Sequence, residues 1–164
     1  MRRTYLPTSN LCTICGSPEQ NRTSLGVRWY FENGHVKTEF ISSVLQMGYK
    51  DIIHGSVISG LLDEALCWVA GVHCRQYFIT GNLNVMFRKP IPVGSKLSVV
   101  GEFHSFNGTY ANCSGSVFTG DLGLCAEGQG RFFPIPNEQA LALTDYWSFQ
   151  PGDLNILRDD AKEG

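Results

Sequence analysis

The chain has 164 residues, which at about 150 residues per domain predicts one domain. Hydrophobic residues make up 43% and charged residues 17%, so the composition supports a packed core and excludes a disordered chain. Thirteen Lys and Arg against 15 Asp and Glu give a net charge of −2, which excludes the strongly basic class of nucleic-acid-binding proteins.

The N-terminal segment, residues 1–24, lacks hydrophobic periodicity and is predicted to be an irregular leader. Its first residues include Arg2 and Arg3, but the apolar segment of a secretory signal does not follow them. We therefore expect a cytoplasmic location. In that compartment the six cysteines are expected to be reduced thiols rather than a disulfide framework.

A β-hairpin is predicted over residues 25–42. The dipeptide Asn33-Gly34 suits a type I′ turn, in which both central residues have positive φ. Folding about this turn places Phe31 opposite Val36 on an apolar face and leaves the other face polar.

A long helix is predicted over residues 56–74, where the sequence is apolar on almost every side. A transmembrane helix is the first alternative. Asp63 and Glu64 lie near its middle, and each carboxylate costs about 3 kcal/mol at the centre of a bilayer. The pattern therefore favours the buried central helix of a globular domain.

After this helix the sequence predicts a meander of antiparallel strands. The expected strands are 77–88, 95–106, 109–119 and 122–133. Asn137 is a possible cap for a short helix that continues to about Tyr146, and the residues from Pro151 onward are expected to be polar and frayed. This order predicts an α+β fold in which one antiparallel sheet packs on one long helix. The domain is expected to span 25–136, with a C-terminal extension over 137–164.

Asp63 is the most informative polar residue of the predicted helix. It shares its helical face with small residues, among them Ser59, Gly60 and Cys67, which leaves room for a thin ligand beside the carboxylate. Buried carboxylates are enriched in active sites. For both Asp63 and Glu64 the alternative is an ordinary position at an exposed helix edge or an ion pair with a distant arginine.

The start of the helix, His54-Gly55-Ser56, offers unpaired backbone N–H groups at the positive end of the helix dipole. The N–H of Gly55 is suited to polarise a carbonyl oxygen, although Ser56 is equally an ordinary helix N-cap. Gly55 and Asp63 lie about 12 Å apart along one helix, too far to act on one substrate. Two helices in a dimer would bring Gly55 of one chain to Asp63 of the other.

Two segments resemble a known family. Residues 54–65, HGSVISGLLDEA, are similar to the HGG-x6-D-x-A signature of the hotdog-fold acyl-CoA thioesterases of the phenylacetate-pathway, PaaI-like type. Residues 83–94, LNVMFRKPIPVG, resemble the strand-and-turn motif of the same family, and the opening Cys12-Thr13-Ile14-Cys15-Gly16 is similar to that of some members. The resemblance covers roughly residues 12–134.

The resemblance implies a hotdog fold, with an antiparallel sheet wrapped around a long central helix, and an acyl-CoA thioesterase active at a dimer interface. Asp63 would be the catalytic carboxylate, the Gly55 N–H would hold the thioester oxygen, and His54 would shape that loop. Thr80 matches a position that orients water or the carboxylate. The expected assembly is a homodimer or a tetramer made of two dimers.

The substrate-binding residues expected beside these are Ser56, Glu64, Asn84, Arg88 and Lys89. Ser56 departs from the family, which usually has a second glycine there, and Arg88 and Lys89 are suited to coenzyme A phosphates, although basic residues at strand ends are often simply solvated. Coenzyme A enters as part of the substrate, and no cofactor is expected.

Other chemistry is less well supported. Cys12-x-x-Cys15 is half of a zinc site or a redox pair, but the sequence has no second CxxC to complete four ligands, so no metal is expected. A non-catalytic acyl-CoA-binding module remains the main alternative to the thioesterase. A hotdog hydratase is disfavoured because Trp68 stands where the D-x4-H pattern requires histidine.

Overall fold

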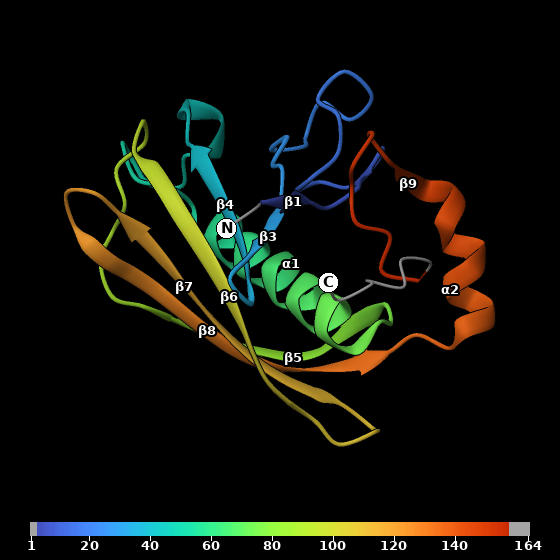
Figure 1. Cartoon of the computed structure of the whole chain (residues 1–164). Helices are drawn as coiled ribbons and strands as arrows, with labels where there is room; N and C mark the ends of the chain where they lie inside the picture. The colour runs from blue at the N-terminus through green and yellow to red at the C-terminus, as the bar shows by residue number, and fades with distance from the viewer. Residues whose placement is uncertain (1–2, 158–164) are drawn as a thin grey trace.

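The computed structural model describes residues 3–157, and its centre is a seven-stranded antiparallel sheet that curves around one long helix (Figure 1). The strand order is β1-β3-β4-β6-β7-β8-β5. The strands of this sheet are β1 (Thr4–Tyr5), β3 (Tyr30–Glu32), β4 (His35–Ile41), β5 (Phe78–Phe87), β6 (Lys96–Phe106), β7 (Ala111–Thr119) and β8 (Gly123–Pro134). The expected α+β architecture is confirmed.

The helices are α1 (Gly55–Cys74) and α2 (Asn137–Leu143), with 3-10 turns η1 (Val44–Gln46) and η2 (Thr144–Tyr146). A separate two-stranded ribbon pairs β2 (Thr8–Ser9) with β9 (Trp147–Ser148).

The predicted hairpin is confirmed in its turn and its register, but its first arm is a strand only over Tyr30–Glu32, so residues 25–29 do not form the strand expected there. Asn33 and Gly34 have φ values of 55° and 80°, as a type I′ turn requires. Phe31 lies opposite Val36, so the two apolar side chains share a face as expected.

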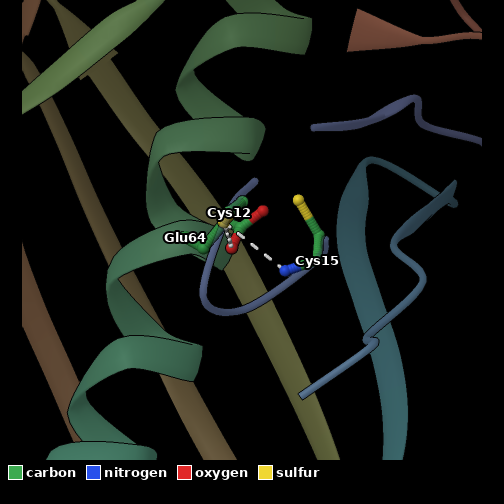
Figure 2. A group of neighbouring side chains, drawn as sticks. All are labelled: Cys12, Cys15 and Glu64. Carbon is green, nitrogen blue, oxygen red and sulfur yellow. Dashed lines mark hydrogen bonds between the residues drawn. The ribbon is translucent and has the colours of Figure 1, made fainter. Parts of the chain in front are cut away.

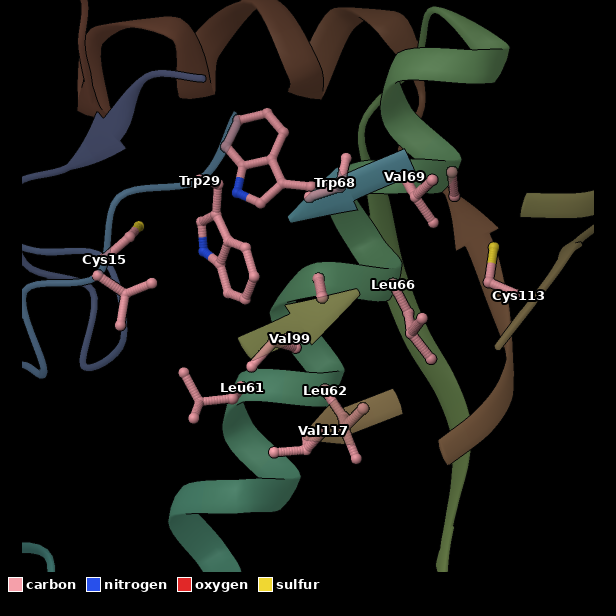
Figure 3. Close-up of a cluster of buried hydrophobic side chains, with 14 of the residues drawn as sticks. Cys15, Trp29, Leu61, Leu62, Leu66, Trp68, Val69, Val99, Cys113 and Val117 are labelled. Carbon is pink, nitrogen blue, oxygen red and sulfur yellow. The ribbon is translucent and has the colours of Figure 1, made fainter. Parts of the chain in front are cut away.

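The helix α1 lies directly on the sheet because glycines remove side chains between the two layers. A Cβ atom on Gly101 would lie 2.9 Å from the Ala65 carbonyl oxygen, so only glycine permits this approach. Leu62 and Leu66 fill the neighbouring space above Gly115, and both are fully buried. Figure 3 shows these leucines among the buried side chains that join helix and sheet. Packing of this kind fixes the position of the polar residues on α1.

Of the helices in residues 3–157, only α1 is long and apolar enough to cross a bilayer by length and composition. Half of its most apolar window is buried within the fold, and it packs against the sheet strands β4 to β8. These contacts are those of a core helix.

The two ends of the chain cover the side of α1 that faces away from the sheet (Figure 1). The segment expected to be irregular contains β1 and β2; β1 joins the main sheet with Thr4 opposite Phe31. The expectation of a frayed tail from Pro151 is wrong as far as the structure describes it, because Ile156 is only 1% exposed and the Leu154 N–H donates to the Tyr5 carbonyl at 2.8 Å. Residues 158–164 of that expected tail lie outside the described residues.

The short C-terminal helix is confirmed, but its predicted cap is wrong. Asn137 is the first helical residue, and the extended Pro136 precedes it without a side-chain cap. Proline presets an extended entry to the helix, so the helix begins at Asn137, one residue earlier than a cap at Asn137 would place it.

Candidate functional site

The Asp63 carboxylate is held by a hydrogen bond from strand β5. The Thr80 hydroxyl donates to Asp63 Oδ1 at 2.5 Å, and the Cys67 Sγ lies 3.5 Å from the same hydroxyl. The pairing of β5 with β8 is irregular between Thr80 and Asn82, so Gly81 bulges out of the ladder. A Cβ atom on Gly81 would lie 2.1 Å from the ring of Phe133. Glycine therefore permits the bulge next to the residue that orients Asp63.

Asp63 lines a cavity of approximately 460 Å³ between α1, the leader and the C-terminal segment. The walls are mostly apolar and include Ile14, Gly60, Trp68, Tyr77, Phe78, Ile135, Leu143 and Trp147. Ser56 and Glu64 also line this cavity.

The C-terminal extension closes one end of this cavity. Trp147 lies with its ring centre 4.9 Å from that of Trp68 and stacks on Tyr77 at 5.6 Å. The sequence left the role of residues 137–164 open. A single tryptophan after a short helix gives no periodic signal, so this contribution could be found only from the folded chain.

The start of α1 is built by His54 rather than by Ser56. His54 is the N-cap: its Nδ1 accepts from the Ser56 N–H at 3.0 Å and lies 2.7 Å from the Ser56 hydroxyl. The alternative that Ser56 caps the helix is therefore wrong. Gly55 becomes the first helical residue, and the N–H of such a residue has no partner within its own helix.

Gly55 lines a second cavity, of approximately 400 Å³, at the N-terminal end of α1. Phe87, Arg88 and Lys89 line the same cavity from the end of β5. Arg88 forms an ion pair with Glu127, and the Lys89 ammonium donates to the Leu122 carbonyl. Both basic residues are more than a third exposed, so they can also turn toward an anion at the mouth.

The predicted site residues therefore separate into two groups within one chain. Ser56, Asp63 and Glu64 line the first cavity, with Thr80 bonded to Asp63, whereas Gly55, Arg88 and Lys89 line the second.

Asn84 belongs to neither group. It lies opposite Gln129 on the sheet face that points away from α1, in a polar depression that His104 also lines. Its neighbours Leu83 and Val85 pack toward the core. Alternation along β5 explains this placement.

Glu64 contacts the leader rather than Asp63. Its Oε2 accepts from the Cys12 thiol at 3.3 Å (Figure 2). Its Oε1 accepts from the Trp68 indole at 3.4 Å. Burial raises the pKa of the Glu64 carboxyl to about 8. The Cys15 thiol and the backbone N–H groups of Cys15 and Ile14 lower the pKa of the Cys12 thiol. No sequence pattern predicts that Glu64 and the CxxC motif meet.

Comparisons with known proteins identify the fold. Residues 50–126 match the family model of the thioesterase superfamily. No curated protein matches the sequence.

Among solved structures, a thioesterase superfamily protein is 23% identical with a TM-score of 0.67; the match covers 75% of this chain and 63% of that protein. The PaaI protein of the Escherichia coli phenylacetic acid degradation operon is 14% identical with a TM-score of 0.62, covering 68% and 81%. A Streptococcus mutans protein bound to acetyl-CoA is 19% identical with a TM-score of 0.59, covering 64% and 84%.

The structural likenesses establish the fold, and the matched segment contains α1 and the strands β5, β6 and β7. The chain has the PaaI-like hotdog fold, and residues 50–126 of it are similar to the thioesterase superfamily.

Proposed function

We propose that this protein hydrolyses an acyl-CoA thioester to a free acid and coenzyme A, at sites shared by two chains of a homodimer. The observation that carries the proposal is the Asp63–Thr80 pair, a carboxylate held at 2.5 Å by a hydroxyl at the wall of an apolar cavity. A carboxylate positioned in this way can act as a nucleophile or as a general base toward water.

A second chain supplies what one chain lacks. Gly55 and Asp63 lie eight residues apart on α1 and line different cavities, about 12 Å apart by helical rise. A twofold axis between two copies of α1 joins the Gly55 end of one helix to the Asp63 region of the other.

The edge of the sheet supports this dimer. β5 is the last strand of the sheet, and within residues 3–157 no strand pairs with its outer edge. The strand is 10 residues long and exposes Ile79, Met86 and Phe87, each by more than half. A long apolar edge of this kind is a template for pairing with another chain, and here a second copy of β5 would cover it.

The reaction requires no metal or organic cofactor. The Gly55 N–H polarises the thioester carbonyl and stabilises the oxyanion that forms there. The carboxylate of the partner's Asp63 attacks the acyl carbon directly or removes a proton from the attacking water. In either route the C–S bond breaks and coenzyme A leaves as the thiol, its sulfur taking up a proton that comes from water. After direct attack, water hydrolyses the anhydride formed between the acyl group and Asp63 and regenerates the carboxylate; in the general-base route, the acyl group leaves directly as the acid with the hydroxyl of water.

Ligand chemistry follows from the two cavities. The aromatic end formed by Trp68, Tyr77 and Trp147 suits an apolar acyl group. Arg88 and Lys89 at the other cavity suit the phosphates of coenzyme A. The acetyl-CoA bound to the Streptococcus mutans neighbour lends support to this class of ligand.

The test is release of free thiol from a panel of aliphatic and aryl acyl-CoAs, together with thermal unfolding in the presence of each ester. We expect turnover of at least one ester. If none is hydrolysed while the esters still raise the melting temperature, the protein is a non-catalytic acyl-CoA-binding module and the proposal fails.

A further inference from the structure

The fold brings a third metal-binding side chain to the Cys12-x-x-Cys15 motif. The ligand atoms of Cys12, Cys15 and Glu64 all lie within 4.8 Å of one another, and Cys12 Sγ lies 3.3 Å from Glu64 Oε2. Glu64 belongs to α1, whereas the two cysteines belong to the leader. Cys12 and Glu64 are 52 positions apart in the sequence. In Figure 2 the three side chains converge from these two segments.

The leader turn prearranges the two sulfur atoms. The backbone N–H groups of Ile14 and Cys15 donate to Cys12 Sγ at 3.3 and 3.5 Å. The Gly16 N–H donates to the Cys12 carbonyl at 3.0 Å, and a Cβ atom on Gly16 would lie 2.3 Å from that oxygen. The turn therefore requires glycine after the second cysteine. Amide donors aimed at a sulfur favour its thiolate form, which is the form that binds metals.

The dimensions of the cluster fit zinc. Bond lengths of about 2.3 Å to sulfur and about 2.0 Å to carboxylate oxygen place two such ligands about 3.5 Å apart in a tetrahedron. The 3.3 Å between Cys12 Sγ and Glu64 Oε2 is close to this separation. Two thiolates favour zinc over magnesium or calcium, which prefer all-oxygen sites.

We infer that Cys12, Cys15 and Glu64 bind one zinc ion per chain, with its fourth coordination position directed toward the cavity that Asp63 lines. Cys12 and Glu64 both line that cavity, whereas Cys15 is 2% exposed and closes the site from behind. Three protein ligands with one open position form a recognised zinc arrangement.

Such an ion would fasten the leader to α1 directly beside Asp63. The wall that Cys12, Thr13 and Ile14 contribute to the cavity would then depend on the metal. The hydrolysis proposed above does not use this ion, because Asp63 is hydrogen-bonded to Thr80 and is not among the three metal ligands.

The test is a titration of the full-length, reduced and metal-free protein with Co²⁺, which reports thiolate ligands through a sulfur-to-cobalt charge-transfer band. We expect saturation at one Co²⁺ per chain and displacement of the band by one equivalent of Zn²⁺. Cys12→Ser, Cys15→Ser and Glu64→Gln should each weaken binding by at least about tenfold, the scale at which even supporting residues of metal sites act. The matched control is Cys74→Ser, which changes a partly buried cysteine of α1 outside the cluster and should leave the titration unchanged.

A folded, reduced wild-type protein that gives no stoichiometric cobalt band would overturn the inference. Equal binding by Cys12→Ser, or an equal loss in Cys74→Ser, would do the same. A Cys12–Cys15 disulfide in protein purified without reductant, followed by no metal binding after reduction, would instead assign the cluster to redox chemistry. Circular dichroism of every variant distinguishes loss of metal binding from loss of fold. Even if a variant does not fold, the wild-type titration alone shows whether the protein binds one metal ion per chain.

Discussion

Replacing Asp63 with asparagine is expected to slow acyl-CoA hydrolysis by about 100-fold or more, the scale of a lost catalytic acid–base group. Asparagine keeps the size of the side chain and an oxygen that can accept the 2.5 Å hydrogen bond from Thr80. It removes the negative charge that attacks the acyl carbon or deprotonates water. The measurement is the rate of free-thiol release from the best ester of the panel, compared with wild type.

The matched control for this variant is Asp121→Asn, which makes the same chemical change in an exposed turn between β7 and β8. It should retain wild-type activity. Equal melting temperatures for the two variants would show that the loss in Asp63→Asn is not a loss of fold. Retention of most of the activity by Asp63→Asn would remove Asp63 from the reaction.

Replacing Gly55 with proline is expected to reduce kcat by about 100- to 1000-fold, because it deletes the backbone N–H that stabilises the oxyanion. Proline is tolerated at this position, which is the first of α1, where the N–H has no helical partner. The preceding His54 has φ −65° and ψ 137°, the extended conformation that proline favours before it. Steady-state kinetics on the same ester measure the effect.

Gly55→Ala separates the donor from the added side chain. A Cβ atom at this position would lie 3.2 Å from the Phe87 ring, and that residue is 54% exposed and free to shift. Alanine introduces the same Cβ but keeps the N–H, so it should retain most of the activity that proline loses. A similar loss in both variants would mean that crowding at Phe87, and not the donor, accounts for the result.

The parts of the fold that could be predicted from sequence are those encoded by local pattern. The turn at Asn33 and Gly34 follows from backbone chemistry, and the register between Phe31 and Val36 follows from that turn. The position of α1 follows from an apolar stretch of helical length interrupted by two acidic residues.

The parts that could not be predicted depend on how distant segments meet. The contact between Glu64 and Cys12 joins residues 52 positions apart, and neither carries a signal of the other. Trp147 reaches the cavity only because β9 pairs with β2 of the leader. The bulge at Gly81 that aims Thr80 at Asp63 shows only in the pairing of β5 with β8.

The roles proposed for Asp63 and Gly55 were expected from the family resemblance and remain predictions. What the folded chain adds is their placement in two different cavities, the arrangement that the proposed site shared by two chains requires. The proposed hydrolysis therefore depends on the shared site more than on either residue alone.

The most direct test of the shared site mixes the two inactive variants. Asp63→Asn and Gly55→Pro chains are coexpressed with different tags, and thiol release is compared with that of each variant alone. A mixed dimer contains one site with an intact Gly55 from one chain and an intact Asp63 from the other, so random pairing should restore roughly a quarter of wild-type activity. Activity no greater than the average of the two separate variants would contradict a site built from two chains.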